Sequence, residues 1–237
     1  MSVTTRDFLI FDITPADIAS AALTATAKNA NVNYNGFIQR QPMKMLDDFF
    51  RGDLAKSVFK RFLRDNDVTN VIDYDDVRTD GFAEPRLRNW HICVNDDKKI
   101  EINSSVIPSR WDLNRIAQDG DVKITKEGSS PFDLTYDIAV QMYFNPIGEY
   151  DISKSSRIRA LNKTNAQILL PDILDVDDRY MEVVGVAWVS QTDVEEFRLE
   201  NVRNHCPLTW SFPNSDREYW DCKIRKCNPF ATIISNL

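Results

Sequence analysis

The chain has 237 residues, of which 43% are hydrophobic and 27% charged, and its formal net charge is −7. This length suits one large domain, and the composition predicts a folded protein rather than a disordered one. No apolar run reaches the roughly 18 residues of a membrane-spanning helix, and the first residues lack the apolar core of a signal peptide. The acidic balance excludes a histone-like coat of positive charge, but it allows a local basic cleft that holds phosphates. Because four cysteines are too few for a disulfide framework, we predict a cytoplasmic protein.

Two helical patterns occupy the N-terminal part of the chain. Residues 14–28 predict a helix with Thr14 as its N-cap and Asp17 in its first turn. Residues 43–64 predict a second helix with one apolar face, which Gly52 could divide into two pieces. We expect the basic residues on its other side to be solvated, with a phosphate-facing helix as the alternative. These basic residues are Lys56, Lys60, Arg61 and Arg64.

From about residue 70 the pattern changes to strands. Strand character is found in residues 71–77, 90–94, 98–108, 121–125, 136–144 and 181–190. Helices are predicted at residues 156–169 and 192–201, the second with Thr192 as its cap. This order predicts an α/β fold with a mixed central sheet flanked by helices. We divide it into an N-terminal helical segment (1–42), a core (43–200) and a C-terminal extension (201–237) packed on the core.

The segments WHICV and KKIEIN alternate apolar and polar residues on either side of a polar turn, which predicts a β-hairpin. If the apolar residues of both strands face one core, Val94 lies across from Ile100, and His91 lies across from Asn103. Glu101 then shares a polar face with His91 and Asn103, within reach of both.

Several segments of the chain resemble the PD-(D/E)xK nuclease superfamily, in particular restriction-endonuclease-like proteins of bacterial defence. These segments are YDDVRTDGF, NWHICV, KKIEINSSVIP, YDIAVQMYF and VVGVAWVS, within about residues 45 to 190. The resemblance implies a restriction-endonuclease-like core that binds DNA and hydrolyses phosphodiesters with Mg²⁺ or Mn²⁺. In this family an Asp on the first hairpin strand and a Glu or Asp on the second hold the metal, and a Lys follows two residues later. Glu101 matches the Glu, whereas His91 stands at the Asp position and Asn103 at the Lys position.

Both departures from the motif predict an impaired site. Imidazole suits Zn²⁺, Ni²⁺ or Cu²⁺ better than Mg²⁺, and the neutral Asn103 cannot supply the charge of a lysine. Losing one preorganised electrostatic group costs roughly 10²- to 10³-fold in rate. We therefore expect a DNA endonuclease whose hydrolysis is impaired by His91 and Asn103. Two alternatives stay open: an inactive DNA-binding or scaffold subunit of a defence complex, and an α/β protein unrelated to nucleases.

Acidic residues before the hairpin are candidates for the missing metal ligand. We assign Asp76 and Asp80 to the metal together with Glu101, and no cofactor is expected if the site is degenerate. Asp75 and Glu84 are further candidates for the same role.

A replacement for the missing lysine could come from Lys99 or Lys123. Lys99 points away from Glu101 if the strand is regular only from Ile100, so Lys123 is the stronger candidate. The resemblance also implies that Gln141 lies near the active-site strands, where it orients water or a ligand.

The C-terminal part of the chain bears on partners. Its basic and aromatic residues could contact a DNA backbone, although a surface helix or edge strand explains them equally well. They are Arg217, Tyr219, Trp220, Lys223, Arg225 and Lys226. Many related nucleases are dimers, so a homodimer through an apolar strand edge at residues 183–189, or a partner protein of a defence system, is also expected. No membrane partner is expected.

Overall fold

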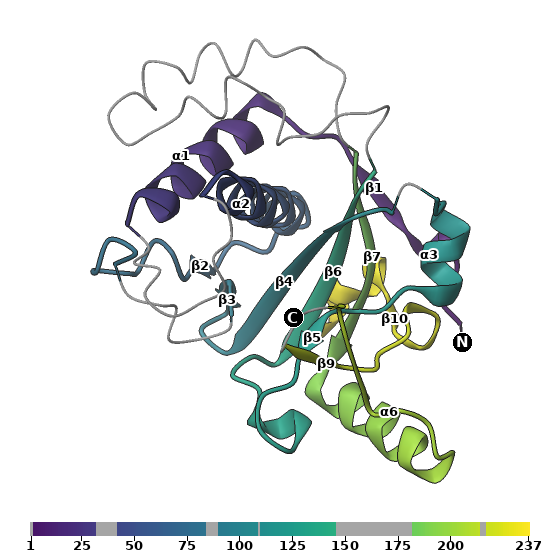
Figure 1. Ribbon diagram of the computed structural model, residues 1–237. Coiled ribbons are helices and arrows are strands. Elements are labelled where there is room, and N and C mark those ends of the chain that lie inside the picture. The colour runs from purple at the N-terminus through teal and green to yellow at the C-terminus, as the bar shows by residue number, and fades with distance from the viewer. Residues whose placement is uncertain (1, 32–41, 84–89, 109, 146–181, 214–216) are drawn as a thin grey trace.

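A computed structural model describes residues 2–31, 42–83, 90–108, 110–145, 182–213 and 217–237 (Figure 1). Within these residues the central layer is a seven-stranded sheet in the order β1-β7-β6-β4-β3-β2, with β10 also paired to β7. Strands β4 and β6 run parallel, and the other neighbours run antiparallel. The strands are β1 (Leu9–Phe11), β2 (Val71–Asp73), β3 (Ile92–Val94), β4 (Lys98–Val106), β6 (Ile138–Asn145), β7 (Glu182–Ser190) and β10 (Asn228–Pro229).

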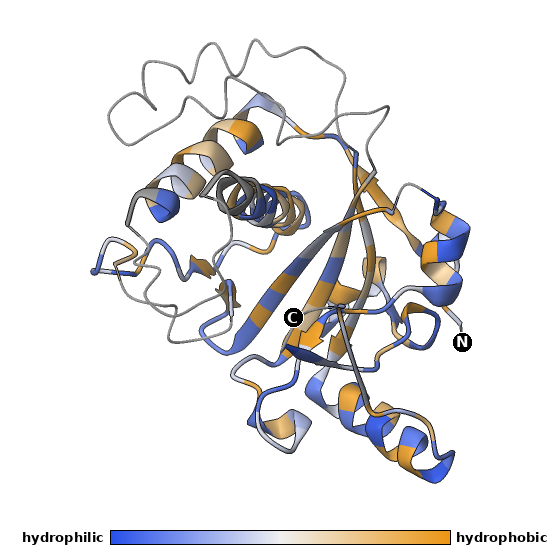
Figure 2. Ribbon diagram, viewed as in Figure 1, coloured by the Kyte–Doolittle hydropathy of each residue, from blue (hydrophilic) through white to orange (hydrophobic). Residues whose placement is uncertain are grey.

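Helices cover both faces of this sheet, which confirms the predicted α/β fold with a mixed central sheet. On one face, alanines of α1 (Pro15–Asn31) and apolar residues of α2 (Pro42–Asp65) form a core with the isoleucines of β3 and β4. On the other face, α3 (Leu113–Asp119) and α6 (Gln191–Arg203) contribute to a second core with β6 and β7. Figure 2 shows that hydrophilic and hydrophobic residues alternate along β4, so the hydrophobic side chains of this strand lie on one face of the sheet.

The N-terminal helix begins as its sequence predicts. The backbone N–H of Thr14 donates to Asp17 at 3.0 Å, and the N–H of Asp17 donates back to the Thr14 hydroxyl at 3.2 Å. This reciprocal pair is a capping box, which satisfies donors at the start of α1. The break that Gly52 could have introduced does not occur: α2 runs continuously through this residue.

The β3–β4 hairpin forms, but its register differs from the prediction by two residues. Ile92 pairs with Ile100 and Val94 with Lys98, so the turn contains only residues 95–97. Asn95 and Asp96 adopt positive φ angles of 53° and 60° there, a conformation that Asn and Asp tolerate better than most residues. A shift of two residues preserves the two faces, so the polar residues still share one side.

The apolar strand β7 is internal to the sheet, so the expected dimer contact through its edge is wrong. β6 pairs with one side of β7, and β1 and β10 pair with the other. The following helix, α6, is capped by Ser190 and not by Thr192, because the Ser190 hydroxyl accepts from the backbone N–H of Asp193 at 3.1 Å. In the described ranges, none of the helices combines the length and apolar character that a membrane crossing requires.

A second, three-stranded sheet lies beside the first and was not predicted. Its order is β5-β9-β8, with β5 (Ile124–Thr125), β8 (Thr209–Ser211) and β9 (Glu218–Trp220). Short helical turns complete the described chain: η1 (Thr5–Asp7), η2 (Pro131–Asp133), η4 (Ile224–Lys226) and η5 (Phe230–Asn236). The helix expected at residues 156–169 lies outside the described residues.

Substitutions at two glycines test the close packing of β7 against η5. A Cβ added at Gly185 would lie 2.5 Å from the buried ring of Phe230, whereas one added at Gly52 would meet nothing within 4 Å. We expect Gly185→Ala to lower the free energy of unfolding by about 1–3 kcal/mol through overpacking. Gly52→Ala should raise it by up to about 1 kcal/mol, because alanine favours a helix interior. Urea unfolding of both variants checks this, and a Gly185→Ala variant as stable as the wild type would contradict the packing.

Candidate functional site

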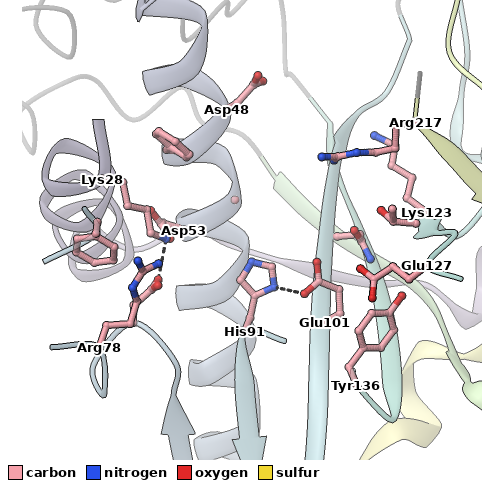
Figure 3. A pocket seen from close by; sticks show the side chains of 16 residues that line it. Lys28, Asp48, Asp53, Arg78, His91, Glu101, Lys123, Glu127, Tyr136 and Arg217 are labelled. Carbon is pink, nitrogen blue, oxygen red and sulfur yellow. Dashed lines mark hydrogen bonds and ion pairs between the residues drawn. The ribbon is translucent and has the colours of Figure 1, made fainter. Parts of the chain in front are cut away.

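A cleft of about 480 Å³ opens between α2, the β3–β4 hairpin and the small sheet. Figure 3 shows Asp48 and Asp53 of α2 on one side, Lys123 and Arg217 on the other, and the hairpin residues between them. The cleft is lined by Lys28, Asp48, Phe49, Gly52, Asp53, Asp75, Arg78, Phe82, His91, Glu101, Asn103, Lys123, Thr125, Glu127, Tyr136 and Arg217.

All three residues at the motif positions line this cleft. The Nδ1 atom of His91 lies 3.0 Å from Oε2 of Glu101. The observed register explains this contact, because His91 N donates to the carbonyl of Ile100 and the His91 side chain therefore stands beside Glu101 rather than across from Asn103. The side-chain amide nitrogen of Asn103 is enclosed and makes no hydrogen bond within the described residues.

The Nδ1 atom of His91 makes a second contact that competes with the first. The backbone N–H of Ile102 donates to it at 3.0 Å. A ring nitrogen that accepts this hydrogen bond has no proton of its own to donate to Glu101, so the two contacts are alternatives. Because the backbone N–H keeps its proton, we favour the hydrogen bond from Ile102, which ties the imidazole to β4.

The residues assigned to the metal are not brought together. Glu101 lines the cleft, but Asp76 and Asp80 do not. Asp76 lies 3.7 Å from Lys60, and Asp80 accepts hydrogen bonds from Arg78 at 2.6 and 2.9 Å. Nowhere in the described ranges do three His, Cys, Asp or Glu side chains group closely enough to hold a metal ion. Of the three residues assigned to the metal, only Glu101 faces the cleft, so the assigned set does not form one site for Mg²⁺ or Mn²⁺.

The other proposed carboxylates give no replacement ligand. Glu84 lies outside the described residues. Asp75 lines the cleft, but its carboxylate contacts Lys28 at 2.7 Å and also binds Lys56. These two lysines already neutralise the carboxylate of Asp75, which a metal ion would otherwise bind.

Asp75 belongs to a lysine–aspartate network that joins α1, α2 and the end of β2. Lys56 lies at its centre, where its Nζ atom is 2.9 Å from Asp73 and also contacts Asp75. Lys56 is only 5% exposed, so the expectation that it lies on a solvated face is wrong. The network consists of Lys28, Lys56, Lys60, Asp53, Asp73 and Asp75.

The charges of the network stabilise one another against burial. Burial disfavours the charged form of Lys56, but three nearby carboxylates outweigh it and raise its pKa from 10.5 to about 12. Burial likewise opposes ionisation of Asp73 and Asp75, yet the lysines lower both pKa values. Asp53 differs, because burial raises its pKa despite Lys28 and Lys56, and its Oδ2 atom has no hydrogen-bond partner among the described residues.

Lys123 reaches the cleft from the segment before β5. Burial, with Arg51 of α2 adding to the effect, lowers its pKa from 10.5 to about 8. Lys99 does not line the cleft. It does share a face of β4 with Glu101, because the strand is regular from Lys98 rather than from Ile100.

Gln141 lies beside the hairpin strand β4, as expected, because it pairs with Asn103, but it is not placed to orient a ligand in the cleft. Its side chain is fully buried and does not line the cleft. Its Oε1 atom accepts the backbone N–H of Lys123 at 3.1 Å, and its Nε2 atom donates to the hydroxyl of Ser105 at 3.2 Å. Gln141 therefore fixes the backbone of Lys123 to the main sheet and is a positioning residue.

Comparisons with protein-family models, curated proteins and solved structures found no match to this chain.

The central place of Lys56 in the network is tested by removing single lysines. Lys56→Met should lower the free energy of unfolding by about 3–5 kcal/mol at pH 7, because it leaves buried carboxylates without their nearest cation. Lys60→Met, at the half-exposed end of the network, should cost at most about 1 kcal/mol. Urea unfolding measures the stability of both variants. Equal losses of stability would contradict the central place of Lys56 in the network.

The pKa shifts in this network predict how the difference in stability between wild type and Lys56→Met depends on pH. The raised pKa of Lys56 means that its contribution is complete below pH 10.5 and is lost as pH rises through about 12. The lowered pKa values of Asp73 and Asp75 mean that theirs is lost as pH falls below 3.8. The stability difference between wild type and Lys56→Met should therefore shrink below about pH 4.

Proposed function

We propose that the protein is a DNA-binding protein with a restriction-endonuclease-like core in which phosphodiester hydrolysis is impaired. One observation carries this proposal: His91, Glu101 and Asn103, the three positions that the sequence resemblance assigns to chemistry, line one cleft together with Lys123. A mixed sheet flanked by helices is also the architecture that the resemblance implies.

The impairment follows from the surroundings of the three motif positions. Asn103 carries no charge, and the imidazole of His91 accepts a hydrogen bond from the backbone of Ile102. Glu101 shares the cleft with Glu127, but the assigned ligands Asp76 and Asp80 do not line it. Loss of one such electrostatic group costs roughly 10²- to 10³-fold in rate, so losing both should abolish measurable cleavage.

The cleft retains groups that suit phosphates. Lys123 and Arg217 line the side opposite α2, and the carboxylates Asp53 and Asp75 on the other side are already paired with lysines. Lysine and arginine bind phosphate oxygens through charge-assisted hydrogen bonds. The cations thus favour retention of DNA binding after the loss of cleavage. A partner protein of a defence system stays a prediction.

Lys123 also favours a second candidate function, a nuclease with residual activity. It is the lysine that could replace the charge missing at Asn103, because both side chains line the same cleft.

A DNA cleavage assay with Mg²⁺ and with Mn²⁺ tests the proposal. We expect the wild type to leave plasmid and linear DNA intact and the double variant His91→Asp plus Asn103→Lys to cut, because it restores the motif. Adding Glu101→Gln to the double variant should remove that activity and serves as the control.

Each other result of this assay is informative. Cleavage by the wild type would contradict the impairment and favour the residual nuclease. A folded double variant that neither cuts nor binds DNA would overturn the restriction-endonuclease-like proposal.

The pKa of Lys123 yields a separate test of DNA binding. Because this pKa is lowered to about 8, Lys123 is charged below pH 8 and loses its proton above it. DNA affinity of the wild type should therefore fall between pH 7 and pH 9, whereas Lys123→Arg should bind with little change over this range. Fluorescence anisotropy measures both proteins. Lys126→Arg is the matched control and should follow the wild type, because Lys126 pairs with Glu218 instead.

A further inference from the structure

One face of the small sheet carries an aromatic cluster next to the cleft. The register of β8, β9 and β5 places Trp210 across from Tyr219 and Tyr219 across from Thr125, so these residues share a face. The rings of Trp210 and Tyr219 stack with centroids 4.7 Å apart, and Phe212 packs edge-on at 5.0 Å from Trp210. We refer to Trp210, Phe212 and Tyr219 as the aromatic cluster.

The same face also supplies two of the cations that line the cleft. Lys123 Nζ lies 5.2 Å from the centroid of the Phe212 ring, and Lys123 and Arg217 both line the cleft. The opposite face of the sheet is closed, because Trp220 and Ile124 are buried in the second core. The small sheet therefore has one buried face and one face that combines aromatic rings with positive charge.

The ring of Phe212 is accessible to solvent on this face. It is 43% exposed, although burial of such a ring would be favourable. Proteins that bind single strands combine stacking rings with cations that follow the backbone. In a duplex the bases stack on one another, and a cleft of about 480 Å³ has the size of a small-ligand site.

From this arrangement we propose that the aromatic cluster binds an unpaired segment of DNA, with bases stacked on Phe212 and phosphates held by Lys123 and Arg217. The strand enters the cleft along this face and brings its backbone toward Glu101. This inference rests on the proposed DNA binding and narrows its substrate class to unpaired DNA.

The test uses two oligomers of equal length: oligothymidine, and an abasic analogue that has the same phosphates but no bases. We expect the full chain to bind oligothymidine more tightly than the abasic oligomer in fluorescence anisotropy. Phe212→Ala should weaken oligothymidine binding by roughly 5- to 150-fold, the range found for loss of a base-stacking ring. It should leave binding of the abasic oligomer nearly unchanged, and Phe212→Trp should retain the preference for bases.

Phe132→Ala is the matched control, because Phe132 is 59% exposed and belongs to η2 rather than to the aromatic cluster. It should bind both oligomers as the wild type does. Thermal unfolding of each variant verifies that the fold is intact.

The remaining outcomes separate this inference from the function on which it rests. If Phe212→Ala weakens both oligomers equally, or no more than Phe132→Ala does, the stacking surface is overturned. If the wild type binds duplex DNA but not oligothymidine, the inference fails and the proposed DNA binding stands. If it binds no DNA of either kind, both fail.

Discussion

The two-residue alternation of β4 is the constraint on which the rest of the structure depends. Ile100 and Ile102 face the core that α1 and α2 close, so Glu101 and Asn103 must face the other way. A shift by one residue would place a carboxylate in that core, at a cost of several kcal/mol. The same alternation therefore holds the sheet against its helices and brings polar side chains to the cleft.

The lysine–aspartate network explains why this cleft differs from a simple metal site. Asp75 reaches the cleft from the end of β2, where a carboxylate could have joined Glu101, but its charge is balanced by Lys28 and Lys56. A buried carboxylate that already has two cations gains little from a third. The acidic residues beside the hairpin thus serve to connect α1 and α2 to the sheet.

The sequence predicts the elements with strong periodicity and fails where distant residues decide the outcome. The capping box at Thr14 and the hairpin strands are local, so their patterns were sufficient. The hairpin register depended on a turn in which Asn95 and Asp96 take positive φ angles, and apolar alternation alone cannot separate two registers of the same parity. The burial of Lys56 and the contact of Gln141 with Lys123 arise from segments far apart in the chain. A spacing of three residues between Asp53 and Lys56 was the one local signal for the network.

The position of β7 has a consequence for the order of folding. The free side of this strand is completed by two short strands, β1 from the beginning of the chain and β10 from near its end. During synthesis, β1 is already available when β7 is made, but the backbone groups of β7 at Ala187 and Trp188 stay unpaired until residues 228–229 have been made. Such an edge can pair with another chain, so the interval before β10 adds is when the nascent protein is most exposed to aggregation.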